Sequence, residues 1–238
     1  MSDFEDLLRE GEEVPVEGWD FSWFEGRATE ERPSWGYSTL LAEHMARAGA
    51  ALDVQTGGAE VLAGIPKAPA LLRATESWPP NLEIARRNLA PLNGEVVHVE
   101  DTDDLPFADG TFDLVVSRHP TTVLWDEIAR VLKPGGRMGV TDIVGEDRLT
   151  SEERLARGSF TGCIAGALSF TEFREGLESV GLVDVSLTAT HDVADGMVSA
   201  IVRATKPADA APLIDLAART DLAFPVAESG CCGGGGCC

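Results

Sequence analysis

Five cysteines are the residues of this sequence with the most distinctive chemistry. Four of them lie in the segment SGCCGGGGCC, as two adjacent pairs separated by four glycines. Thiolates are the preferred ligands of soft metal ions, and adjacent thiols also exchange with disulfides. The glycines allow both pairs to fold around one ion. We therefore expect a thiol site, for a thiophilic ion or for redox chemistry, formed by Cys231, Cys232, Cys237 and Cys238, whereas the fifth cysteine, Cys163, lies inside the body of the chain.

Acidic residues and glycines gather where the predicted strands end. The apolar run AALDV contains Asp53 and leads into a glycine pair, and 23 residues after Asp53 the segment ALLRATE ends in Glu76. Ligands of open α/β sheets bind at the carboxyl ends of the strands, where glycines admit them and an acidic side chain accepts hydrogen bonds from ribose hydroxyls. After the third strand, Asp101 is placed to accept a hydrogen bond from an adenine amino group. The candidate cofactor-binding residues are Asp53, Gly57, Gly58, Glu76, Asp101, Thr102 and Ser117.

Strands and helices alternate along the middle of the chain. Runs rich in β-branched residues, such as EVVHVED and FDLVVSR, are separated by amphipathic segments such as NLEIARRNLAPL and TTVLWDEIARVL. This alternation predicts an α/β fold with a largely parallel sheet that is covered on both faces.

The C-terminal part of the sheet is predicted from a capping motif and two further strands. In SFTEFREGLESVG, Ser169 and Glu172 form a capping box at the start of a helix, and Gly181 ends it. The segments DVSLTAT and MVSAIVRATK follow closely enough to pair as an antiparallel edge.

Composition limits the classes of function. The chain has a formal net charge of −21, which repels a phosphate backbone, so we expect no nucleic-acid partner. No apolar run approaches the roughly 18 residues of a membrane span, so we expect no membrane partner. The acidic start MSDFEDLLRE has no signal-peptide core. We expect a cytoplasmic protein, in which the thiols stay reduced.

The length of 238 residues suits one α/β domain with short appendages. We expect an N-terminal cap segment over residues 1–33 and the main domain over residues 34–206. Residues 207–238 are rich in Ala, Pro and Asp and end in the cysteine pairs, which predicts a flexible tail.

The segments ALDVQTGGAE, ATE, EDTDDLPFADGTFDLVVS and IARVLKPGGR together resemble the class I S-adenosylmethionine-dependent methyltransferases. The resemblance covers residues 34–206. It implies a three-layer, Rossmann-like sheet of seven strands, mostly parallel with an antiparallel last strand, and S-adenosylmethionine as the cofactor. Gln55 and Ala59 stand where this family usually has glycines.

The segment GSFTGCIAGALSFTEFREGLESVGLVDV is similar to the C-terminal half of arsenite methyltransferases. The resemblance implies that Cys163 is a catalytic residue and an arsenic ligand, and that the substrate is a small molecule, arsenite or its thiol conjugate. External thiols would act as the reductant. Because trivalent arsenic prefers several sulfur ligands, the tail cysteines are candidates to complete the site.

Two other functions are compatible with the same residues. The chain could methylate another small molecule, with the tail as an accessory. It could also be a thiol-based metal or metalloid-binding protein on an inactive methyltransferase scaffold, which is favoured if Gln55 and Ala59 close the cofactor loop. A dinucleotide dehydrogenase is disfavoured because the chain lacks G-x-G-x-x-G.

Overall fold

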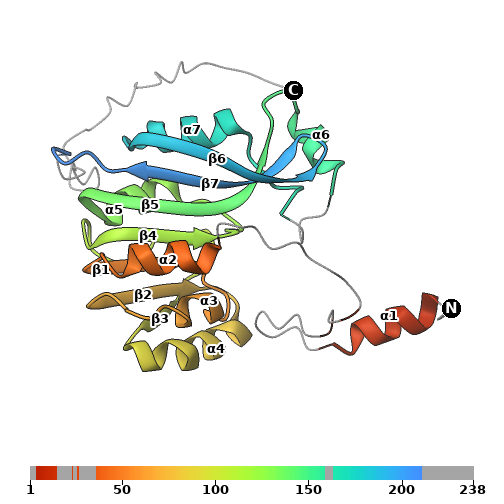
Figure 1. Ribbon diagram of the computed structural model, residues 1–238, viewed down its shortest axis with the longest axis horizontal. Helices are drawn as coiled ribbons and strands as arrows, with labels where there is room; N and C mark the ends of the chain where they lie inside the picture. The colour runs from red at the N-terminus through yellow and green to blue at the C-terminus, as the bar shows by residue number, and fades with distance from the viewer. Residues whose placement is uncertain (1–3, 15–22, 24–25, 27–35, 159–162, 211–238) are drawn as a thin grey trace, which may run out of the picture.

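The sheet at the centre of the molecule has the strand order β3-β2-β1-β4-β5-β7-β6. The computed structural model describes residues 4–14, 23, 26, 36–158 and 163–210 (Figure 1). The strands are β1 (Ala50–Val54), β2 (Leu71–Glu76), β3 (Glu95–His98), β4 (Phe112–Arg118), β5 (Leu132–Gly145), β6 (Val183–Ala194) and β7 (Met197–Thr205). All neighbours from β3 to β5 pair in parallel, and β7 runs antiparallel to both β5 and β6. This is the predicted fold class.

Helices cover both faces of the sheet (Figure 1). Their bounds are α1 (Phe4–Glu12), α2 (Tyr37–Met45), α3 (Glu60–Ala63), α4 (Pro79–Leu89), the 3-10 turn η2 (Ala90–Leu92), α5 (Trp125–Val131), α6 (Ser151–Leu155) and α7 (Phe170–Ser179). None of the helices in the described residues is long and apolar enough to cross a membrane.

Two hydrophobic clusters lie on opposite faces of the sheet. Successive strand residues point to opposite faces, so in β4 Leu114 packs with the cluster of α2, α3 and α4, whereas Val115 packs with the cluster of α5 and α7. Phe173 and Leu177 of α7 are fully buried in the second cluster. Burial on both faces explains why the central strands read as continuous apolar runs.

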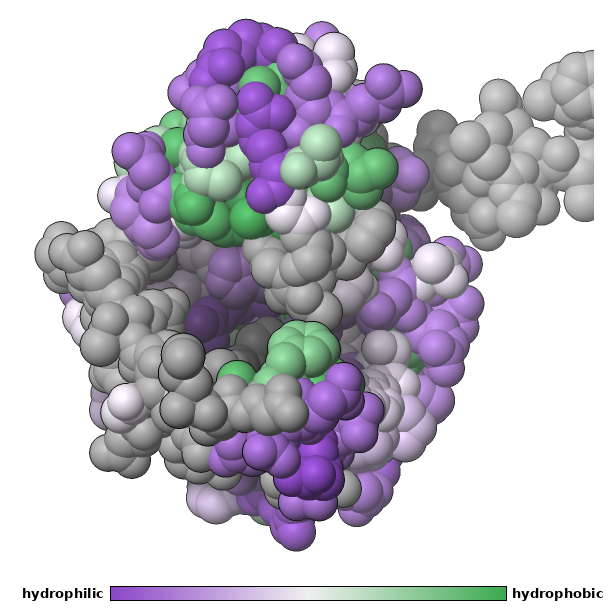
Figure 2. Space-filling model, turned by 90° about the vertical axis from the view of Figure 1, so that its right-hand side faces the viewer, coloured by the Kyte–Doolittle hydropathy of each residue, from purple (hydrophilic) through white to green (hydrophobic). Residues whose placement is uncertain are grey.

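The carboxyl ends of the parallel strands meet at one edge of the sheet. Val54 of β1 pairs with Ser117 of β4, and Arg118 pairs with Thr141 of β5. We call this side of the molecule the carboxyl edge. Figure 2 faces it and shows a hollow with hydrophilic residues inside.

The third strand is shorter than predicted. It ends at His98, which pairs with Glu76 at the end of β2. Because β2 ends there, the following residues have no neighbouring strand to extend the ladder. Asp101 and Thr102 therefore lie in a turn beyond the strand and not at its last residues.

The predicted capping box is confirmed. The Ser169 hydroxyl accepts from the Glu172 backbone N–H, and the Glu172 carboxylate accepts from the Ser169 N–H. Gly181 follows α7 with φ +80°, a conformation that favours glycine. These two signals fix the helix that leads into β6, as the sequence predicts.

Candidate cofactor and acceptor site

The loop that follows β1, residues 55–59, alternates left-handed and right-handed backbone. Gln55, Gly57 and Ala59 have φ values of 58°, 65° and 58°. Gln55 and Ala59 therefore adopt the conformation that glycine adopts without strain, at a cost of about 1 kcal/mol each. The loop, which we call the cofactor loop, keeps its shape although two of its glycines are replaced.

Glu76 ties the cofactor loop to the end of β2. Its Oε2 accepts from the Gly57 N–H at 2.7 Å, and its Oε1 accepts from the Trp78 N–H at 2.8 Å. Burial raises the pKa of Glu76, and these backbone hydrogen bonds oppose that rise. The carboxylate is thus held at the strand end, where an acidic side chain suits ribose hydroxyls.

Asp53 is buried beneath the same loop. Its Oδ2 accepts from the Thr56 hydroxyl at 2.7 Å, and burial raises the pKa of Asp53 to about 7. Tyr37 and Arg118, which sequence reasoning did not single out, line a cavity of about 40 Å³ together with Asp53. The Arg118 guanidinium carbon lies 5.6 Å from the centre of the Tyr37 ring. The cavity is smaller than a nucleotide-sized ligand, so it can enclose only part of one.

A larger cavity, of about 220 Å³, lies between α2 and the face of β5, β7 and β6, with Leu40, His44, Ile201 and Arg203 in its wall. It runs along one face of the sheet, from Arg137 to Thr141 of β5, and is lined by no residue of β1 or β2. The glycines and acidic side chains converge on the smaller cavity, which we therefore assign to the cofactor.

The remaining predicted cofactor residues have different surroundings. The Ser117 hydroxyl is buried and donates to the Val54 carbonyl at 2.7 Å, so it joins β4 to β1. Asp101 accepts from the Thr121 hydroxyl at 2.5 Å, and Thr102 is exposed in the same turn. Gly58 is buried, and an added Cβ would clash with the Glu60 carboxylate.

Gln55 connects the cofactor loop to the loop that follows β4. Its side-chain oxygen accepts from the Thr121 N–H at 2.6 Å, and its side-chain nitrogen donates to the Thr122 carbonyl at 2.9 Å. A glycine could make neither bond. We call this pair of hydrogen bonds the Gln55 bridge.

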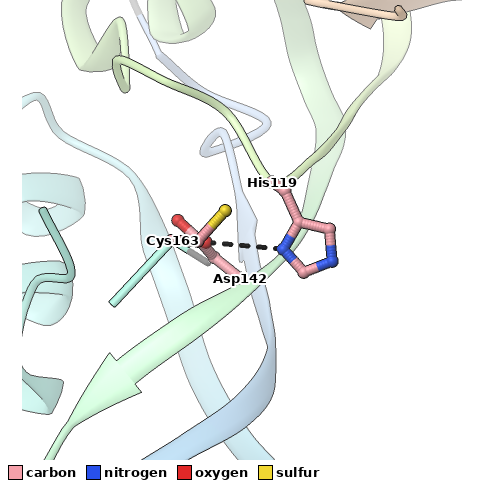
Figure 3. A group of neighbouring side chains, drawn as sticks. All are labelled: His119, Asp142 and Cys163. Atoms are coloured by element: carbon pink, nitrogen blue, oxygen red, sulfur yellow. Dashed lines mark ion pairs between the residues drawn. The ribbon is translucent and has the colours of Figure 1, made fainter. Parts of the chain in front are cut away.

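His119, Asp142 and Cys163 come together beside this loop (Figure 3). One nitrogen, one oxygen and one sulfur atom of these residues all lie within 4.8 Å of one another. They come from the end of β4, from β5 and from the segment before α7, and we call them the His-Asp-Cys cluster. His119 Nδ1 lies 3.7 Å from Asp142 Oδ1. Burial alone would lower the pKa of His119, but Asp142 and Cys163 raise it to about 9.

The predicted arsenic ligands are only partly described by the structure. Cys163 has φ +57° and a half-buried side chain. Its neighbours His119 and Asp142 were missed, because no local spacing joins residues of three separate elements. The other predicted ligands, Cys231, Cys232, Cys237 and Cys238, lie outside the described residues, as do more than half of the predicted cap and most of the predicted tail.

Comparisons with known proteins agree with this geometry. Residues 52–140 match the family described as "Methyltransferase domain". The chain is 28% identical over 151 residues to an arsenite methyltransferase of Halobacterium salinarum, covering 55% of this chain and 39% of that protein. It is 30% identical over 102 residues to an arsenite methyltransferase of Aquipseudomonas alcaligenes, covering 40% of this chain and 30% of that protein. The chain thus matches less than half the length of these curated relatives.

A solved structure shares the fold. Geranyl diphosphate C-methyltransferase from Streptomyces coelicolor A3(2), in complex with S-adenosyl-L-homocysteine, superposes with a TM-score of 0.58 at 14% identity, over 71% of this chain and 74% of that one. Glu76 fits S-adenosylmethionine, because it places a carboxylate at the end of β2 beside the cofactor loop, where it suits ribose hydroxyls. Residues 52–140, which carry this loop, thus match a methyltransferase domain, and they lie in a sheet with the predicted seven strands.

Proposed function

We propose that the chain methylates trivalent arsenic that is bound by thiolates. The position of Cys163 carries this proposal, because its thiol lies in the His-Asp-Cys cluster at the carboxyl edge of the sheet. His119 of that cluster comes just before Thr121, which the Gln55 bridge joins to the cofactor loop. The curated relatives named arsenite methyltransferase support arsenic as the acceptor.

The chain's own residues would bind and orient the two reactants. Glu76 and the cofactor loop would hold the ribose, with Asp53 beneath the loop. When bound, S-adenosylmethionine supplies a methyl group whose bond to sulfur breaks with the electron pair left on sulfur, while the arsenic lone pair forms the new As–C bond. The methylated arsenic is then pentavalent, and two external thiols return it to the trivalent state as they join in a disulfide.

Cys163 would supply one thiolate and fix the arsenic near the cofactor loop. The further sulfur ligands would come from the four C-terminal cysteines or from a thiol conjugate of arsenite. Transfer needs no general base, because arsenic attacks with a lone pair and no proton has to leave it. Holding the acceptor in place is then the main contribution of the protein.

The proposal is tested by single-turnover incubation with methyl-labelled S-adenosylmethionine, arsenite and glutathione. Wild type is compared with Cys163→Ser and with a full chain in which Cys231, Cys232, Cys237 and Cys238 are serines. Labelled methylarsenic that forms with wild type and is lost with Cys163→Ser is the expected result. The four-serine chain reports whether the tail thiols take part.

Other outcomes of this experiment would support one of the two alternative functions. Cofactor binding without labelled arsenic, in wild type, would indicate a methyltransferase of another small molecule. Arsenite binding without cofactor binding would indicate a thiol-based binding protein on an inactive scaffold. Either result overturns the proposal of arsenic methylation.

A further inference from the structure

The His-Asp-Cys cluster has an unsatisfied buried atom at its centre. His119 Nδ1 is inaccessible to solvent and has no hydrogen-bond partner among the described residues. Its distance of 3.7 Å from Asp142 Oδ1 is too long for a hydrogen bond. A buried polar atom without a partner costs about 1–3 kcal/mol. A positive ion between the three side chains would remove this cost.

The three donors are chemically different, and this decides which ion they suit. One imidazole nitrogen, one carboxylate oxygen and one sulfur form a mixed set, whereas a soft metalloid prefers sulfur alone. Zn²⁺ accepts all three donor types and often has three protein ligands with a fourth position open. Such donors lie about 3.3–3.6 Å apart around one zinc ion, so the cluster must contract by about 1 Å.

The surroundings hold the ligands toward a common point. Asp142 Oδ1, which lies 3.7 Å from His119 Nδ1, also accepts from the Ile143 N–H at 2.8 Å, and this bond orients the carboxylate. His119 and Cys163 both have left-handed backbone, with φ values of 52° and 57°. Strained backbone of this kind persists where the surrounding structure fixes a side chain for a ligand. Figure 3 shows Asp142 and Cys163 on the same side of the His119 ring.

We propose that His119, Asp142 and Cys163 form a Zn²⁺ site with one open coordination position at the carboxyl edge. The site goes beyond arsenic methylation and does not depend on it. Where both hold, Zn²⁺ and arsenite compete for the Cys163 sulfur, so zinc slows the labelled transfer described above.

The test measures Zn²⁺ binding by competition with a chromophoric chelator, without cofactor or arsenite. It uses the full chain with Cys231, Cys232, Cys237 and Cys238 changed to serine, because those thiols would bind zinc themselves. We expect one Zn²⁺ per chain, and at least a tenfold weaker affinity after His119→Gln, Asp142→Asn or Cys163→Ser. Co²⁺ in place of zinc should give a thiolate charge-transfer absorption that Cys163→Ser removes.

A matched control is His191→Gln, an exposed histidine on β6 that lies outside the cluster. It should leave zinc affinity unchanged, and unaltered circular dichroism of each variant verifies that it folds. Absence of stoichiometric zinc binding in the four-serine chain, or an unchanged affinity after any one of the three cluster substitutions, overturns the proposal. Because arsenic plays no part in this measurement, it tests the zinc site even if the chain does not methylate arsenic.

Discussion

The two halves of the carboxyl edge differ in how their buried polar atoms are satisfied. In the cofactor half, which comprises β1, β2 and their loops, Asp53 and Glu76 accept short hydrogen bonds from nearby residues. In the acceptor half, which comprises β4, β5 and the Cys163 segment, His119 Nδ1 and the Thr141 hydroxyl are buried without partners among the described residues. The first half is organised before any ligand arrives. The second half instead brings buried polar atoms together that a bound ion could satisfy.

The largest expected effect tests the organisation of the cofactor half. The pKa of Asp53 is raised to about 7, so between pH 4 and 7 the folded protein retains a proton that the unfolded chain releases. Stability should therefore fall as the pH rises through this window, by an amount on the order of 4 kcal/mol. Asp53→Asn has no titrating group at this position. Its free energy of unfolding, measured with urea at several pH values, should therefore change less with pH than that of wild type. The exposed Asp103→Asn is the control, and a wild-type slope in Asp53→Asn would contradict the prediction.

Removal of Glu76 should break the cofactor half. Glu76→Ala loses the carboxylate that holds the Gly57 N–H and that we assign to the ribose. Hydrogen bonds to charged groups contribute about 1.5–3 kcal/mol, so affinity for S-adenosylmethionine should fall about 100-fold. Isothermal titration calorimetry measures this change. Glu83→Ala, which removes an exposed carboxylate from α4, should retain wild-type affinity.

Arg154 offers a way to loosen the acceptor half alone. Its side chain is buried, donates to the Leu149 carbonyl at 2.9 Å and pairs with Glu172 at 2.7 Å. Arg154→Ala should lower the free energy of unfolding by about 2 kcal/mol, because the hydrogen bond of the buried guanidinium, its ion pair with the exposed Glu172 and its packing are lost. Hydrogen exchange should then increase around α6 and the start of α7 but not in β1 or β2. Arg174→Ala, at an exposed position on α7, should change stability little.

The smallest expected effect concerns the strain in the cofactor loop. Ala59→Gly relieves a left-handed alanine and should stabilise the protein by up to about 1 kcal/mol. Ala63→Gly in α3 is the matched control, because glycine in a helix is less favourable than alanine by about 1 kcal/mol. Thermal unfolding of the two variants should therefore shift in opposite directions. Destabilisation by Ala59→Gly would mean that the loop is not strained.

The same contrast explains what the sequence could predict. The structure confirms the seven strands and the capping box at Ser169, which local sequence patterns predict. The placement of Asp53, Gly57 and Glu76 near one another follows from their spacing within one βαβ unit. The end of β3 was misplaced because it depends on where its partner β2 stops. His119 and Asp142 could not be predicted as a pair, because only the β4–β5 register and a left-handed turn bring them together.

Gln55 connects the cofactor half and the acceptor half through its side chain. Its side chain joins the cofactor loop to the loop after β4, and His119 lies at the start of that loop. A ligand that shifts one end of the Gln55 bridge would therefore change the free energy of ligand binding at the other end. By thermodynamic linkage, any factor by which bound cofactor alters acceptor affinity must equal the factor by which bound acceptor alters cofactor affinity. A glutamine in place of a glycine thus provides a physical route for cooperativity between the two ligands.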